Sequence, residues 1–148
     1  DFLIKKFEQI GIKEQIKFIP RTKKFNDHLN YYNEIDIALD TFPYNGVTTT
    51  FEAIWKGVPV LTIEGYNFNS RCGSSIIKNL GINYLVAKNE DDYISKAIYL
   101  SNNLDYLSEI RDNVFNDALN SPLFDNKNFV NDFENKINFL IKNELENN

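Results

Sequence analysis

The sequence has 148 residues, of which 43% are hydrophobic and 14% aromatic, so it is long enough and apolar enough to bury the core of one domain. Its formal net charge of −5 argues against nucleic acid or an anionic membrane surface as a partner, because both attract basic patches. No apolar run approaches the roughly 18 residues of a membrane-spanning helix, and the only cysteine, Cys72, has no partner for a disulfide, which favours a reducing compartment such as the cytoplasm.

The N-terminal part of the chain predicts a helix before any strand. Apolar residues recur at helical spacing over residues 1–10, and Gly11 predicts the end of this helix. A short strand is predicted at Lys17–Ile19, and a short helix over Phe25–Asn33. Because we expect the first strand of an α/β domain to precede its first helix, the sequence suggests a piece of a longer protein.

The central part predicts the repeating unit of a parallel sheet. A short apolar run at Ile37–Leu39 is followed by turn-forming residues at positions 43–46, which predicts a buried strand that leads into a loop. A helix is predicted over residues 48–56, because three threonines that can cap its start precede apolar residues at helical spacing, and Gly57 predicts its end. The β-branched run 58–63 then predicts a second strand.

The C-terminal part is predicted to be mainly helical. Ser70 opens a helix that Gly81 ends, residues 83–86 predict a last short strand, and three helices follow from Asp91 onward. We therefore predict one α/β domain over residues 1–148: a doubly wound parallel sheet with helices on both faces, and a C-terminal helical cap. The α/β core would span residues 1–90 and the C-terminal helices residues 91–148.

The loop before the central helix has the chemistry of a phosphate site. Backbone N–H groups without partners, the positive end of the helix dipole and the hydroxyls of Thr48, Thr49 and Thr50 converge at the helix start. Gly46 allows a close approach of the backbone, and Glu52 could accept bonds from ribose hydroxyls. These residues alone leave open that the threonines only cap an ordinary helix. Neither a Gly-x-Gly-x-x-Gly motif nor a P-loop is present.

One family shares this pattern over nearly the whole chain from about Ile16 onward. The string Leu-Asp-Thr-Phe-Pro-Tyr-Asn-Gly-Val-Thr-Thr-Thr within residues 36–62, together with Ser-Arg at 70–71, Ala-Lys-Asn at 87–89 and Ser-Pro-Leu-Phe at 121–124, resembles the C-terminal part of O-GlcNAc transferase and SPINDLY-like proteins, glycosyltransferase family 41. The resemblance implies the C-terminal, Rossmann-like half of a GT-B glycosyltransferase.

The resemblance also implies a function. The parent enzyme would transfer N-acetylglucosamine from UDP-GlcNAc, or alternatively fucose from GDP-fucose, to serine or threonine of proteins. Catalytic and acceptor-binding residues would lie in an N-terminal half and in TPR repeats, so this part alone is expected to be inactive. Helix N-terminal donors can stabilise the leaving diphosphate without a metal, so we expect no cofactor. The different class left open is a stand-alone nucleotide-binding or protein-interaction module.

The same resemblance assigns roles to individual residues. His28 lies eight residues before Asp36, where the family carries a histidine beside the nucleobase. Glu52 takes the place of a ribose-binding carboxylate, and glutamate is common there in bacterial SPINDLY-like members. Val47 replaces a histidine of the human-type members, so one diphosphate contact is lost. The predicted binding residues are His28, Asn45, Gly46, Thr48, Thr49, Thr50 and Glu52, and no catalytic or metal-binding residue is predicted.

Some nearby residues have structural interpretations instead. Phe51 and Trp55 are predicted to be core, because aromatic residues spaced by four on a helix beside a sheet usually are. Arg71 is expected to pair with Glu64 rather than with a phosphate. Asp40 is predicted, with Asn45, to fix the loop by side-chain bonds to backbone N–H groups.

Overall fold

The protein has an α/β fold built on a small parallel sheet. The computed structural model describes residues 2–146. Strands β1 (Ala38–Leu39), β2 (Val60–Ile63) and β3 (Val86–Ala87) lie in the order β1-β2-β3, and both neighbouring pairs are parallel. Residue Ala38 is paired with Val60, and Thr62 with Val86.

Helices connect and follow these strands. In chain order they are α1 (Phe2–Gln9), the 3₁₀ helix η1 (Lys13–Gln15), α2 (Phe25–Asn30), η2 (Tyr31–Glu34), α3 (Thr48–Trp55), α4 (Cys72–Asn79), η3 (Asn83–Leu85), α5 (Glu90–Asn102), α6 (Leu104–Leu119), η4 (Pro122–Phe124) and α7 (Asn126–Glu146).

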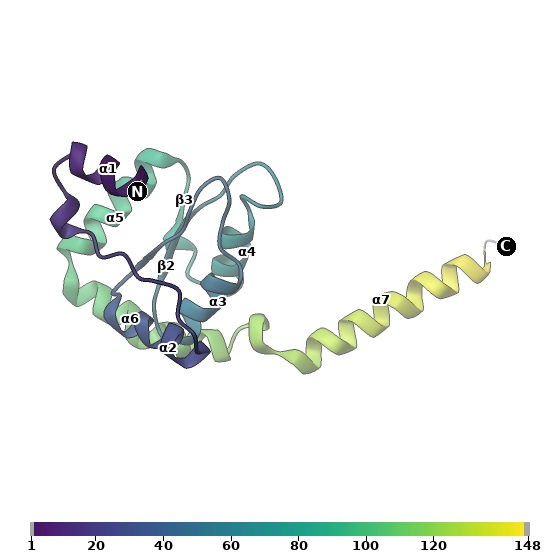
Figure 1. Ribbon diagram of the computed structural model, residues 1–148. Coiled ribbons are helices and arrows are strands. Elements are labelled where there is room, and N and C mark those ends of the chain that lie inside the picture. The colour runs from purple at the N-terminus through teal and green to yellow at the C-terminus, as the bar shows by residue number, and fades with distance from the viewer. Residues whose placement is uncertain (1, 147–148) are drawn as a thin grey trace.

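The helices cover both faces of the sheet, as predicted. Helices α3 and α4 contact β2 on one side and α5 contacts β2 and β3 on the other, while α6 packs against α3 and α5 (Figure 1). All four residues of β2 are buried, as expected for a central parallel strand covered on both faces. The predicted fold class is confirmed.

The hydrophobic core lies where β2 meets α3, α4 and α6. Its buried members are Tyr32, Ala53, Ile54, Val58, Val60, Ile76, Ile77, Leu80, Ile82, Leu85, Leu100, Leu107, Ile110, Val114 and Ala118. The sheet is therefore held mainly by apolar packing around one central strand. This packing fixes the carboxyl end of β1, from which the candidate site begins.

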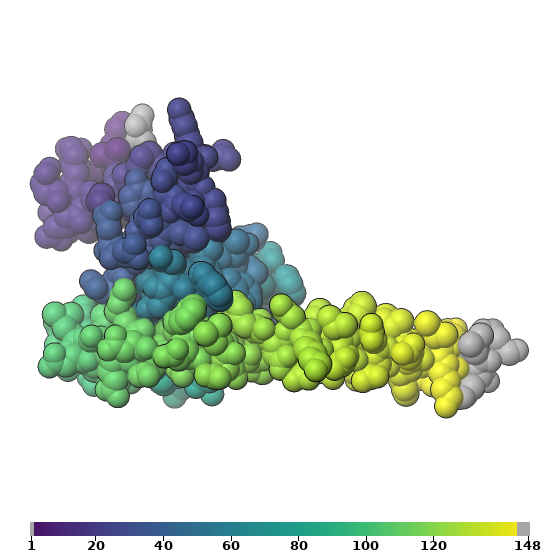
Figure 2. Space-filling view, turned by 90° about the horizontal axis from the view of Figure 1, so that it is seen from below, coloured from purple at the N-terminus to yellow at the C-terminus, as the bar shows by residue number. Residues whose placement is uncertain are grey.

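The last helix behaves differently from the other C-terminal helices. Helices α5 and α6 cover the sheet, but α7 extends away from the rest of the molecule as a long arm (Figures 1 and 2). Apolar side chains on it, including Phe133 and Leu140, are more than half exposed. The predicted helical cap therefore consists of α5 and α6, without α7. Within residues 2–146, no helix is both long and apolar enough to cross a membrane.

Three local predictions differ from the structure. Lys17–Ile19 forms no strand, and the side chains of Phe18 and Ile19 remain about half exposed with no neighbouring strand to pair with. Most of the strand predicted at 83–86 forms the 3₁₀ helix η3 instead. Strand β3 therefore contains only Val86 and Ala87. Trp55, predicted to be core, is 48% exposed and packs edge-on against Phe115 and at a tilt against Phe124.

Candidate functional site

The loop that follows β1 is anchored by Asp40. One carboxylate oxygen of Asp40 accepts a hydrogen bond from the Gly46 N–H (2.7 Å), and the other accepts one from the Thr62 hydroxyl (2.7 Å). The Tyr93 hydroxyl donates to the Asp40 carbonyl (2.9 Å). A Cβ at Gly46 would lie 2.4 Å from Oγ1 of Thr49 and 3.2 Å from Oγ1 of Thr50, so a larger residue would force these threonine side chains to shift. The loop is thus tied to the sheet and to α5, and the prediction that Asp40 fixes it is confirmed.

Asn45 and Thr50 also shape the loop from within. The Asn45 side chain is buried and its amide donates to the Thr41 carbonyl (2.7 Å), while its backbone N–H donates to the Asn69 carbonyl (3.1 Å). The side-chain oxygen of Asn45 has no hydrogen-bond partner among the residues that the structure describes. The Thr50 hydroxyl is buried too and donates to the Gly46 carbonyl (3.0 Å). Both side chains therefore point into the protein. The prediction that the Asn45 side chain bonds to a backbone N–H group was wrong, because its amide donates to a backbone carbonyl instead.

The start of α3 presents donors that the protein does not use. The side chains of Thr48 and Thr49 are exposed. The first backbone bond of the helix runs from the Phe51 N–H to the Val47 carbonyl (3.0 Å), and within the described residues the N–H groups of residues 48–50 have no acceptor. No acidic residue lies in the first turn. A helix N-terminus of this kind attracts anions, because its N–H groups and dipole both carry partial positive charge.

Glu52 lies one turn into α3 and is held through one of its two oxygens. Its Oε2 lies 2.9 Å from Nε2 of His28 and accepts a hydrogen bond from the Tyr32 hydroxyl (3.1 Å), which is also 3.3 Å from the Thr49 carbonyl. Burial raises the pKa of Tyr32 to about 12, with a contribution from its bond to Glu52, so the hydroxyl keeps its proton. The Oε1 atom of Glu52 has no protein donor within the described residues, although the side chain is only 14% exposed.

A cavity of about 700 Å³ lies beside this cluster. His28 and Tyr32 form part of its wall, and the segment before α2 completes it. That segment brings Arg21, Lys23 and Lys24 to the cavity. The hollow next to the Glu52 cluster is therefore lined by aromatic and basic side chains.

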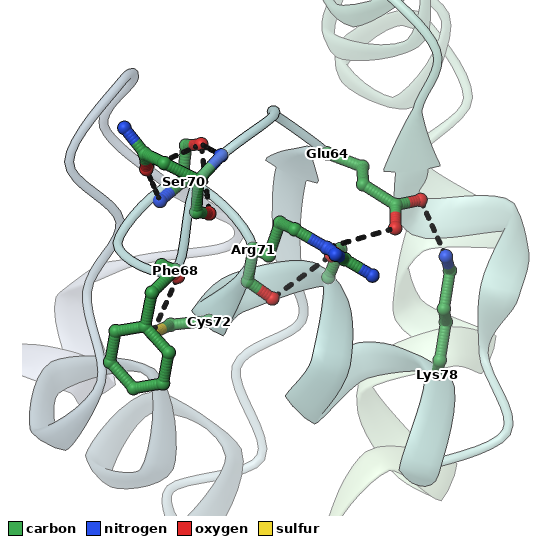
Figure 3. A network of polar contacts seen from close by, with 8 residues as sticks. Glu64, Phe68, Ser70, Arg71, Cys72 and Lys78 are labelled. Atoms are coloured by element: carbon green, nitrogen blue, oxygen red, sulfur yellow. Dashed lines mark hydrogen bonds and ion pairs between the residues drawn. The ribbon is translucent and has the colours of Figure 1, made fainter.

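Arg71 is engaged away from this cluster. The carboxylate of Glu64 lies between the Arg71 guanidinium (3.9 Å) and the Lys78 ammonium group, which Figure 3 shows as two separate contacts. The pairing predicted for Arg71 and Glu64 is confirmed. In the same loop, the aromatic side chains of Tyr66 and Phe68 are strongly exposed.

The structure brings the predicted residues together around α3. His28 and Glu52 are in direct contact, and Thr48 and Thr49 open the same helix that carries Glu52. The sequence analysis missed the role of Tyr32, whose position four residues after His28 on a helical segment was the available signal. Within residues 2–146, no group of three or more His, Cys, Asp and Glu side chains could hold a metal ion.

Known proteins are similar to this chain in both sequence and fold. The family model for glycosyl transferase family 41 matches residues 2–133. A protein named probable UDP-N-acetylglucosamine–peptide N-acetylglucosaminyltransferase SPINDLY, from Eustoma exaltatum subsp. russellianum, is 38% identical over 86% of this chain. The UDP-N-acetylglucosamine–peptide N-acetylglucosaminyltransferase of Caenorhabditis elegans is 33% identical over 78% of it.

A solved structure gives the same result. A mutant O-GlcNAc transferase from Thermobaculum terrenum matches 92% of this chain with a TM-score of 0.78 and 34% identity. The present chain spans 14% of the SPINDLY relative, 10% of the C. elegans relative and 26% of the T. terrenum chain. On the family model and on these relatives, the chain belongs to glycosyltransferase family 41.

Proposed function

We propose that this chain is the nucleotide-sugar-binding part of a glycosyltransferase that modifies proteins on serine or threonine. The observation that supports it best is the adjacency of two unsatisfied groups on α3. The N–H donors of residues 48–50 lie at its start, and Oε1 of Glu52 lies one turn further along. A nucleoside diphosphate needs this combination, donors for its phosphates and an acceptor for its ribose hydroxyls.

The proposal gives each part of the nucleotide a position. The diphosphate would lie on the first turn of α3, against Thr48 and Thr49. The ribose would bond to Oε1 of Glu52, and the base would enter the cavity beside His28. In sugar transfer the diphosphate leaves with negative charge, and preorganised N–H donors at a helix start stabilise that charge. We assign this stabilisation to α3 and propose no metal ion in the step.

The donor sugar is proposed from the relatives. The names of the SPINDLY and C. elegans relatives specify UDP-N-acetylglucosamine and peptide. We therefore propose UDP-GlcNAc as donor and proteins as acceptors, with GDP-fucose as the alternative donor to be tested beside it. The unpaired Cys72 supports a reducing compartment, and we place the enzyme in the cytoplasm.

The proposal assigns binding but not transfer to these 148 residues. The chain corresponds to a small part of its relatives' length, and a GT-B donor is held between two halves. We therefore propose that acceptor binding and catalysis need regions that this chain does not contain.

Isothermal titration of the chain with UDP-GlcNAc, GDP-fucose, UDP and GDP tests the proposal. Either the uridine nucleotides or the guanosine nucleotides should bind with a dissociation constant in the millimolar range or below. The nucleosides uridine and guanosine, which lack phosphate, should bind more weakly. Incubation with labelled donor and an acceptor peptide should leave the peptide unlabelled. Absence of binding by every nucleotide would refute the proposed site, and labelled peptide would refute the claim that other regions are required.

A further inference from the structure

Tyr32 connects two groups that the proposed function uses separately. Its hydroxyl lies 3.1 Å from Oε2 of Glu52 and 3.3 Å from the carbonyl oxygen of Thr49. Glu52 is the proposed ribose acceptor, and Thr49 belongs to the proposed phosphate-binding turn. The single hydroxyl proton is therefore shared between two acceptors on α3, and the shorter of the two contacts is to Glu52.

The geometry also determines which oxygen of Glu52 is left for a ligand. Both neighbours of the carboxylate, His28 at 2.9 Å and Tyr32 at 3.1 Å, contact the same atom, Oε2. Oε1 has no donor within the part of the chain that the structure describes, and it is not among the fully buried polar atoms, so it remains open to a ligand. Because His28 and Tyr32 both hold Oε2, the carboxylate cannot rotate freely, and the orientation of Oε1 is fixed as well.

Tyr32 is well suited to hold the carboxylate still. Its side chain is 8% exposed and belongs to the hydrophobic core, and its ring packs edge-on against the imidazole of His28 with centroids 5.7 Å apart. His28 in contrast is 42% exposed on its side chain, so fewer packing contacts hold it in place. The rigid partner of Glu52 is therefore Tyr32.

We propose that Tyr32 is a positioning residue for nucleotide binding, which fixes Glu52 so that Oε1 faces the ribose hydroxyls. This inference rests on the proposed function. It predicts that the hydroxyl of Tyr32, as distinct from the ring, which lines the cavity, matters only for ligands that carry ribose hydroxyls, because the hydroxyl acts through Glu52.

The variant Tyr32→Phe tests this, because it keeps the ring in the core and removes only the hydroxyl. UDP, or GDP if the chain prefers it, should bind roughly fivefold to tenfold more weakly to the variant, since a hydrogen bond to a charged group is among the stronger ones. A nucleotide analogue that lacks both ribose hydroxyls should bind equally to variant and wild type. Tyr99→Phe is the matched control, because Tyr99 is exposed on α5 and far in sequence from the site.

Testing Tyr32→Phe in the Glu52→Ala variant separates a positioning role of the Tyr32 hydroxyl from a general effect of its loss on the fold. In Glu52→Ala the carboxylate is gone, so adding Tyr32→Phe should change the affinity for UDP by less than twofold. Equal weakening for the intact nucleotide and the analogue, or an undiminished effect in the Glu52→Ala background, would overturn the proposal. Failure of the wild-type chain to bind any nucleotide would instead refute the proposed function, so the two failures are distinguishable.

Discussion

At the residue scale, the binding role proposed for Glu52 makes a graded prediction. Glu52→Gln keeps an acceptor oxygen but loses the charge, whereas Glu52→Ala loses both, and bonds to a charged acceptor are about twice as strong as neutral ones. We expect alanine to cost about 1.5–3 kcal/mol of UDP or GDP binding and glutamine to cost less. Calorimetric titration measures both variants, with circular dichroism to confirm that they fold. Equal, negligible losses would show that the carboxylate does not contact the ligand.

Asp40 gives a prediction about stability and pH. Burial raises the pKa of Asp40 above its ordinary value of 3.8, although bonds from Gly46 and Thr62 act in the opposite direction. The folded protein therefore takes up this proton at a higher pH than the unfolded chain does. The stability that Asp40 contributes is fully present below the unfolded pKa of about 3.8 and is lost as the pH rises through the raised pKa.

The variant Asp40→Asn isolates this effect, because it removes the titration and keeps the shape. Urea unfolding at a series of pH values should give a free-energy difference, wild type minus variant, that falls as the pH rises from below 3.8. A difference that rises over this range would mean that the hydrogen bonds to the carboxylate outweigh its burial.

The contacts around the site show which roles could be predicted from residue type alone. The pairing of Arg71 with Glu64 was predictable, because opposite charges seven residues apart flank one loop. The contact of Glu52 with His28 spans 24 positions and depends on how α2 packs beside α3, which no local pattern contains. The contact of Tyr32 with Glu52 depends on the same packing, because a spacing of four residues from His28 shows only that the two side chains share a helix face and not what that face contacts. The ring of Tyr32 packs in the hydrophobic core, whereas its hydroxyl donates a hydrogen bond to Glu52.

At the scale of elements, the start of α3 is the feature that the proposal depends on most. Replacing Thr48 and Thr49 together with valine removes two exposed hydroxyls and leaves the backbone N–H groups in place. Affinity for UDP or GDP should fall by roughly 2–4 kcal/mol, because each lost bond to phosphate is charge-assisted. The binding of the corresponding nucleoside, which has no phosphate, should stay the same. Unchanged affinity for the diphosphate would place the phosphates elsewhere.

Helix α7 and helix α4 should contribute very differently to stability. Ile77 on α4 is fully buried, so Ile77→Ala should lower the free energy of unfolding by about 2–5 kcal/mol. Leu140 on α7 is 57% exposed, so Leu140→Ala should change it by less than about 0.5 kcal/mol. Denaturant titration of both variants checks this. A large loss from Leu140→Ala would show that α7 packs against the body in solution.

The elements also show where sequence patterns are sufficient. Helix α3 begins at Thr48 as predicted, although its N-cap residue is Val47 and no threonine side chain caps it. It ends one residue before the predicted end, and Gly57 just beyond adopts a positive φ of 70° that favours glycine. The strand predicted at Lys17–Ile19 was wrong, because an apolar run forms a strand only beside a partner, and no described strand pairs with it. The direction in which α7 extends could not be predicted either. The hydrophobic pattern of a helix shows which face is apolar but not what packs against that face.

At the scale of the whole molecule, a compact α/β body carries the candidate site, and one long helix leaves it (Figure 1). The site combines the loop after β1, the start of α3 and the segment around His28, which contacts α3 through Glu52. Parallel α/β folds bind ligands where strands end and helices begin. The arrangement therefore agrees with the family to which the chain belongs.

The proposed binding of a nucleoside diphosphate at the start of α3 underlies every role assigned above. Backbone amide chemical shifts of the isotope-labelled chain, followed while UDP or GDP is added to millimolar concentration, test it most directly. We predict shifts that concentrate on residues 46–52 and around His28, and no comparable shifts on α7. Shifts absent with both nucleotides, or confined to other parts of the chain, would contradict the account.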